Sequence, residues 1–214
     1  MCNIIEISEK NQNKIIVNIN GSGNIVKVAN ADIKNENSKI IININGNDNL
    51  IDIQKIVLVN DVFTINLNNA NKNAIICKEN VYINRGLNIN IFPAGPGAKP
   101  DNCQIIIEKQ VFFNGHNIVF MIGEENTNIN IGENCLFASN ISLNTSDNHG
   151  IYDLNTKKRL NQAGDINIGT HCWICNDVKF LNNTNISHDC VIATNALVTS
   201  INTPPPLYNR WSAC

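Results

Sequence analysis

The stretch IGTHCWICNDVKFLNNTNISHDCVIATNALVTS, residues 168–200, places an apolar side chain at every sixth position. These apolar residues are Ile168, Ile174, Phe180, Ile186, Ile192 and Val198. The fourth residue after each of the first five is small or β-branched: Cys172, Val178, Thr184, Cys190 and Ala196. Two patterns with the same period of six indicate a repeat rather than the simple alternation of an ordinary strand.

This period predicts a solenoid of short strands. Each hexapeptide forms a strand and a corner, with the apolar residue inside and the small residue near the crowded corner. Three sides close a coil of about 18 residues, and coils stack by parallel β pairing. Ile131, Phe137 and Leu143 keep the same spacing. Asn and Gly suit the corners because they tolerate positive φ. The expected fold class is therefore all-β, a triangular parallel β-helix.

The first 128 residues repeat more loosely. KIIVNINGSGNIVKV (residues 14–28) recurs as KIIININGNDNLIDI (residues 39–53), and each copy reads as strand, turn, strand. The abundance of Asn and Ile has a simple explanation in an AT-rich genome. We predict an irregular, Asn- and Ile-rich β-solenoid over residues 1–128 and a regular hexapeptide-repeat β-helix over residues 129–203.

Charge and composition argue against several classes of protein. A formal net charge of −2 and the lack of a basic stripe disfavour nucleic-acid binding. The sequence shows no signal-peptide pattern and no apolar run of the roughly 20 residues that span a bilayer, so a cytoplasmic protein is expected. The eight Cys are expected to be free thiols. His171, Cys172 and Cys175 lack the second ligand pair of a zinc site, so no metal is predicted.

One segment, TSDNHGIYDLNTKKRL at residues 145–160, breaks the monotony with a His, an Asp, a Tyr and three consecutive basic residues. We expect a loop over residues 145–165 that bulges from the solenoid, with His149 at its start. From the residues alone, His149 is either an exposed loop histidine or a general base, because imidazole exchanges a proton near neutral pH. Asp147 either orients the imidazole ring or caps the turn.

The segment CLFASNISLNTSDNHGIYDLNTKKRLNQAGDINIGTHCWICNDVKFL resembles the hexapeptide-repeat acyltransferases, especially bacterial capsule and sialic-acid O-acetyltransferases. In those enzymes a Thr-Asp-x-His-like stretch ends a coil, and a loop leads to an Ile-Gly-x-His-x-Trp-Ile-Gly coil. The resemblance is close over residues 129–201 and loose before them. It implies a left-handed β-helix, acetyl-CoA as acyl donor, a cell-surface glycan or sugar as acceptor (capsule, lipooligosaccharide or sialic acid), and a homotrimer with sites between neighbouring solenoids.

The resemblance also implies roles for single residues. His149 matches the base that takes the proton of the attacking sugar hydroxyl, and a backbone N–H would stabilise the oxyanion. Trp173 matches the aromatic that lines the acetyl and acceptor site, whereas the residues alone allow plain packing at a subunit contact. From the residues alone, the run Lys157, Lys158 and Arg159 either meets an anionic sugar or the phosphates of CoA, or is simply a solvated loop. We expect Tyr152, Lys158 and Arg159 to contact the acceptor. Ala193 and Thr199 are the expected contacts of acetyl-CoA.

The sequence departs from the family in two ways. Gly is usual where this chain has Cys175, Asn183, Ser187 and Asn195, and positive φ is less comfortable for Cys and Ser, so local stability is expected to suffer. The chain ends PPPLYNRWSAC where members continue with Ile-Ala-Gly-x-Pro-Ala-Lys. One coding of that tail, read one base later, gives His-Cys-Ile-Ile-Ala-Gly-Val-Pro, so we interpret residues 204–214 as a frameshifted tail.

Three functions compete at this point. The leading one is an O-acetyltransferase. The alternative is a non-catalytic β-solenoid scaffold, or an inactive remnant of such an enzyme, which the lost glycines and the altered tail favour. A carbohydrate lyase or adhesin on a right-handed β-helix does not explain the period of six. FPAGPGAKPDNC, residues 92–103, is predicted to be a rigid Pro/Gly loop that either covers a face of the helix or makes a subunit contact.

Overall fold

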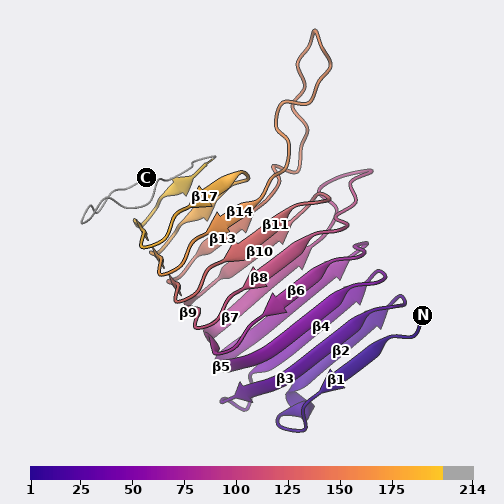
Figure 1. Cartoon of the computed structure of the whole chain (residues 1–214), viewed down its shortest axis with the longest axis vertical. Coiled ribbons are helices and arrows are strands. Elements are labelled where there is room, and N and C mark those ends of the chain that lie inside the picture. The colour runs from indigo at the N-terminus through magenta and orange to yellow at the C-terminus, as the bar shows by residue number, and fades with distance from the viewer. Residues whose placement is uncertain (200–214) are drawn as a thin grey trace.

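The computed structural model describes residues 1–199, which form one continuous parallel β-helix (Figure 1). Within them lie 19 strands and one short 3₁₀ helix, η1 (Gln12–Lys14). The strands pair in parallel with strands one coil away, as the hexapeptide pattern predicts. The all-β parallel β-helix is therefore confirmed. The predicted frameshifted tail, residues 204–214, lies outside the described residues.

The strands stack into three faces. Face A contains β1 (Ile4–Ile7), the starts of β3 (Ile25–Ile33) and β5 (Leu50–Asn68), β6 (Ala74–Cys77), β8 (Gln104–Ile107), β11 (Asn128–Ile131), β14 (Ile166–Ile168) and β17 (Thr184–Ile186). Face B contains the end of β3, the middle of β5, the start of β7 (Val81–Ile91), β9 (Phe112–His116), β12 (Leu136–Phe137), β15 (Trp173–Ile174) and β18 (Val191–Ile192). Face C contains β2 (Ile15–Asn20), β4 (Lys39–Asn45), the ends of β5 and β7, β10 (Ile118–Ile122), β13 (Ile141–Asn144), β16 (Lys179–Phe180) and β19 (Leu197–Val198).

Coil length changes along the solenoid. Ile15 pairs with Ile40, 25 residues later, which matches the spacing of the sequence repeat. Near the C-terminal end Trp173 pairs with Val191, and the coil has the predicted 18 residues. Pairing runs without a break through β11, which joins β8 on one side and β14 on the other. The division at residue 128 therefore stays a prediction within a continuous stack.

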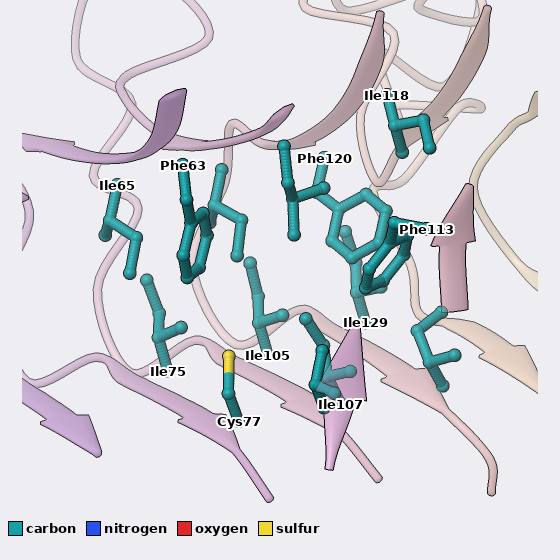
Figure 2. Close-up of a cluster of buried hydrophobic side chains, with 14 of the residues drawn as sticks. Phe63, Ile65, Ile75, Cys77, Ile105, Ile107, Phe113, Ile118, Phe120 and Ile129 are labelled. Atoms are coloured by element: carbon teal, nitrogen blue, oxygen red, sulfur yellow. The ribbon is translucent and has the colours of Figure 1, made fainter. Parts of the chain in front are cut away.

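The core is a column of stacked apolar residues, as the period of six predicts. Ile168, Ile174, Phe180, Ile186, Ile192 and Val198 are all buried. Phe113 lies at the centre of an aromatic cluster in the middle coils, with ring centroids 5.0 Å from Phe137 and 5.9 Å from Phe120. Figure 2 shows Phe113 and Phe120 among the inward-pointing Ile side chains of several coils. This burial of apolar side chains is the main source of stability for the stacked coils.

The corners explain one departure from the family pattern. Positive φ recurs every six residues in the last coils, at His171 (57°), Asp177 (60°), Asn183 (59°), Asp189 (59°) and Asn195 (63°). Cys175 and Ser187 are not among the positive-φ residues. The expected strain at these two positions is therefore wrong: the left-handed corner position is occupied by Asn, Asp or His, which tolerate it.

Asn has a structural role that composition alone did not reveal. Asn24, Asn49 and Asn73 are buried at the corner between faces C and A in successive coils. The Nδ2 and backbone N–H of Asn49 donate to Asn24 Oδ1, both at 3.0 Å, and the same two groups of Asn73 donate to Asn49 Oδ1. The ladder continues to Cys103, whose backbone N–H donates to Asn73 Oδ1 at 2.8 Å. Each amide thus satisfies buried backbone groups that would otherwise lack partners.

Candidate active site

The loop at residues 145–165 leaves the solenoid at the corner between faces C and A, which we call the loop corner. Leu136 pairs with Trp173, 37 residues later, whereas the following coil takes 18. The 19 extra residues lie between β13 and β14 and project from the stack (Figure 1). Their outer part folds back on itself: Leu160 N–H donates to Ile151 O at 2.7 Å, and Tyr152 and Arg159 form an antiparallel bridge.

The two ends of this loop are fixed to the solenoid. Thr145 N–H donates to Met121 O at 3.1 Å, and Gly164 N–H donates to Thr145 O at 2.9 Å. The hydroxyl groups of Thr145 and Thr127 lie 3.1 Å apart and are buried. The loop therefore begins and ends at Thr145, which is buried against the solenoid. This fixes the place at which the segment with His149 leaves the solenoid.

An ion pair ties the returning part of the loop, at Arg159, to Glu124 of the solenoid. Arg159 NH1 and NH2 donate to the two carboxylate oxygens of Glu124 at 2.5 and 2.7 Å, and the Ser146 hydroxyl donates to Glu124 Oε1 at 2.5 Å. The side chains of Arg159 and Glu124 are 20% and 19% exposed. The hydrogen bonds from Arg159, and secondarily from Ser146, hold the pKa of the Glu124 carboxyl below its usual range despite partial burial. We call these three residues the loop latch.

His149 lies at the base of the loop with an exposed side chain. Asn161 closes the loop neck around it: its Nδ2 donates to His149 O at 2.7 Å and to Asp147 Oδ2 at 2.9 Å. No hydrogen bond joins the His149 ring to another side chain in residues 1–199. The exposed ring is thus accessible to a ligand at this corner. Asp147 braces the neck of the loop in this structure, and its predicted role in orienting His149 stays a prediction.

The other predicted acceptor contacts differ in their surroundings. Tyr152 is 58% exposed on the loop at residues 145–165, and Lys157 and Lys158 of the same loop are also exposed. These three side chains are available to a ligand. The guanidinium of Arg159 instead donates two hydrogen bonds to the carboxylate of Glu124. The sequence predicted that Arg159 contacts the acceptor. It gave no sign of Glu124, which lies 35 residues before Arg159 in the chain.

Trp173 points outward from face B, 44% exposed. In register with it stand Tyr82, Phe112, Leu136 and Val191, which form a column of apolar side chains along this face. The rings of Tyr82 and Phe112 have centroids 5.7 Å apart. Face B is the face that does not adjoin the loop corner. The structure therefore does not bring Trp173 and His149 of one chain together.

The two predicted acetyl-CoA contacts lie on the last described coil. Ala193 follows β18, and Thr199 follows β19 at the loop corner; both side chains are exposed. Thr199 O accepts a hydrogen bond from Thr184 Oγ1 at 3.2 Å. No group of three or more His, Cys, Asp or Glu side chains in residues 1–199 is arranged to hold a metal ion.

A second polar cluster, which the sequence did not predict, consists of His171, His188 and Asp189. His171 Nδ1 lies 2.6 Å from Asp189 Oδ1, and His188 Nδ1 lies 2.6 Å from Asp189 Oδ2. These hydrogen bonds, from His188 first and then His171, lower the pKa of the Asp189 carboxyl. The three exposed residues occupy the corner between faces A and B on consecutive coils.

Comparison with known proteins identifies relatives. No family model matches the chain. A "Polysialic acid O-acetyltransferase" of Escherichia coli O1:K1 / APEC is 36% identical over 62 residues, which are 29% of this chain and 20% of the relative. One from Neisseria meningitidis is 35% identical over 57 residues, 27% of this chain and 26% of the relative. Over these short segments the chain is similar to two polysialic acid O-acetyltransferases. The matched segments span about a fifth and a quarter of these proteins.

A solved structure extends the similarity to the whole fold. The crystal structure of "the polySia specific acetyltransferase NeuO" matches 95% of this chain and 88% of its own, with a TM-score of 0.63 and 22% identity. This agreement confirms the expected fold class as a left-handed parallel β-helix. Within residues 1–199, no helix is long and apolar enough to cross a membrane.

Proposed function

We propose that the chain is an O-acetyltransferase that moves an acetyl group from acetyl-CoA to a hydroxyl of a sialic-acid-containing glycan. The observation that carries the proposal is His149, exposed and free of side-chain hydrogen bonds at the base of a loop latched to the solenoid. The similarity to polysialic acid O-acetyltransferases of two bacteria supports the acceptor class.

The reaction follows from this base. His149 takes the proton of the sugar hydroxyl, whose oxygen attacks the thioester carbonyl. The new C–O bond forms, the C–S bond breaks, and the proton passes to the departing CoA sulfur, so that free thiol and acetylated sugar result. Tyr152 and Lys158 contact the acceptor, because both are exposed on the loop that begins with His149. No covalent enzyme intermediate is needed.

The position of Trp173 supports a homotrimer in which one chain supplies His149 and its neighbour supplies Trp173. The two residues lie on opposite sides of a triangular solenoid, so a shared site needs two chains. The apolar column of Tyr82, Phe112, Leu136 and Trp173 is a surface whose exposed area would favour such a contact. In this arrangement Ala193 and Thr199 contact acetyl-CoA on the last coils. Use of acetyl-CoA agrees with a cytoplasmic location.

The test is release of free thiol from acetyl-CoA on addition of polysialic acid. Acceptor-dependent release by the chain, its loss in His149→Ala and its retention in His116→Ala, another exposed His, are expected. Release that persists in His149→Ala would remove His149 as the base. No release from a folded chain with any sialylated acceptor would favour the scaffold function instead.

Co-expression tests the shared site. His149→Ala and Trp173→Ala are each expected to be inactive alone. Mixed oligomers would regain up to about a quarter of the activity, because some sites combine an intact His149 with an intact Trp173. Two inactive variants that never complement each other would contradict a site built from two chains.

A further inference from the structure

Three thiols stack at one corner of the solenoid. Cys135, Cys172 and Cys190 lie on consecutive coils at the corner between faces A and B, each directly before a strand of face B. Those strands, β12, β15 and β18, pair with one another in register. Cys135 is fully buried, Cys172 is 2% exposed, and Cys190 is partly buried against the same core. The proposed reaction uses none of these sulfur atoms.

Cys135 and Cys172 are in direct contact. The backbone N–H of Leu136 donates to Cys172 O at 2.9 Å, and the backbone N–H of Cys172 donates to Cys135 Sγ at 3.5 Å. Residues paired in this way on neighbouring strands have Cα atoms about 4.8 Å apart, inside the range of about 4.4–6.8 Å that disulfides require. The fold therefore holds the two thiols at a separation at which a disulfide can close.

Cys135 is more reactive than the isolated buried thiols of the chain. The side-chain hydrogen bond with Cys172 lowers the pKa of the Cys135 thiol, although burial opposes this effect. The same contact raises the pKa of Cys172, so the proton of the pair stays on Cys172. Burial raises the pKa of the Cys77 thiol to about 12 and also raises that of Cys103. Because the thiolate is the reactive form, an oxidant reacts with Cys135 before it reacts with Cys77 or Cys103.

The pair brackets the candidate active site along the chain. Cys135 and Cys172 are 37 residues apart, and the segment between them contains the loop at residues 145–165 with His149. Trp173 directly follows Cys172. A bond between the two sulfur atoms would close this segment into a ring and remove conformational freedom from the unfolded chain.

We propose that Cys135 and Cys172 are a modification site, which hydrogen peroxide converts to an intrachain disulfide that stabilises the coils around the loop. The Cys135 thiolate attacks one peroxide oxygen, the O–O bond breaks, and hydroxide leaves as water with the proton of Cys135, which becomes a sulfenic acid. The Cys172 sulfur then attacks the sulfenic sulfur, the S–O bond breaks, and the hydroxyl leaves as water with the proton of Cys172. Two thiols thus lose two electrons and two hydrogens, and one peroxide becomes two waters. This site does not depend on acetyl transfer.

Mass spectrometry of the unaltered chain tests the bond. The folded, reduced chain would be treated with hydrogen peroxide, its remaining thiols blocked, and the protein digested. We expect linked peptides joined through Cys135 and Cys172, which dithiothreitol separates. Recovery of both residues as blocked thiols would overturn the proposal, and so would a disulfide that joins Cys172 to Cys175 or Cys190 instead.

Cys77 is the control for selectivity in the same sample. It is as fully buried as Cys135, but it stacks on Ile53 and Ile107 rather than on a second thiol. We expect Cys77 to remain a thiol after the peroxide treatment. Oxidation of Cys77 to the same extent as Cys135 would show that the stacked pair has no special reactivity and would overturn the proposal.

Thermal unfolding measures the consequence of the bond. The oxidised chain is expected to unfold about 5–10 °C above the reduced chain, because the disulfide closes a long loop, and dithiothreitol should reverse the shift. Cys190→Ala, which removes only the third thiol of the stack, should keep the peroxide-dependent shift, whereas Cys135→Ala should lose it. A midpoint that stays unchanged or falls when the linked peptides form would overturn the stabilising disulfide.

Discussion

Replacing Glu124 with Gln is expected to loosen the loop that carries His149 without unfolding the solenoid. Gln keeps the size of the side chain and one acceptor oxygen. It loses the negative charge that receives both nitrogens of Arg159 and the hydroxyl of Ser146. The core residues of the solenoid do not depend on this contact, so the change should act on residues 145–165.

The magnitude follows from the geometry. The pair is bidentate, and both side chains are about one-fifth exposed, so screening by solvent is limited. Hydrogen bonds to charged groups contribute about 1–2 kcal/mol in such a setting. Loss of that amount raises the population of the open loop about 5- to 30-fold, since 1.4 kcal/mol is a factor of ten.

Amide hydrogen exchange measures this opening directly. The reporters are the N–H groups of Gly164 and Leu160, which donate to Thr145 O and Ile151 O. We expect both to exchange about 5- to 30-fold faster in Glu124→Gln, with unchanged exchange in β11, and kcat to fall more than KM changes. Glu125→Gln, the exposed neighbour, is the matched control and should exchange as the unaltered chain does. Unchanged exchange at Gly164 and Leu160 in Glu124→Gln would refute the latch.

Three further predictions concern stability and reactivity. Because the folded-state pKa of Glu124 is lowered, the latch contributes fully above the unfolded-state pKa near 4.5. The difference in unfolding free energy between the chain and Glu124→Gln should shrink below pH 4.5 and be lost as the pH falls through the folded-state pKa of Glu124. Asn49→Ala should cost about 3–5 kcal/mol in chemical denaturation because it leaves buried donors and acceptors unpaired, whereas Asn18→Ala on the exposed row should cost under about 1 kcal/mol; equal costs would contradict the buried ladder. Burial raises the pKa of the Cys77 thiol to about 12, so iodoacetamide at pH 8 should alkylate exposed Cys2 and spare Cys77 until urea is added, and rapid native alkylation of Cys77 would show that the core opens.

The repeat made the fold predictable because its physical cause is local. An apolar residue at every sixth position must face a common interior, and the buried Ile168 and Ile174 do so. The loop at residues 145–165 was predictable for the same reason, since it interrupts the period. The corner conformations were harder to predict. Cys175 looked strained because its position usually holds Gly, yet the left-handed residue at that corner is Asp177.

Contacts between coils could not be predicted, because they depend on coil length. Asn24 and Asn49 are 25 residues apart, whereas Asn73 and Cys103 are 30 apart, so no single spacing reveals the buried ladder. Glu124 and Arg159 are separated by a loop of irregular length. The placement of His149 and Trp173 on opposite sides of the solenoid likewise requires knowing which face each coil position occupies.

Transfer of a labelled acetyl group tests the account most directly. Polysialic acid would be incubated with ¹³C-acetyl-CoA and the chain, and the sialic acid units would then be examined by mass spectrometry. We predict labelled O-acetyl groups with the unaltered chain and none with folded His149→Ala. Equal labelling by both proteins would contradict the role of His149, and an unlabelled glycan in every reaction would contradict the acetyltransferase itself.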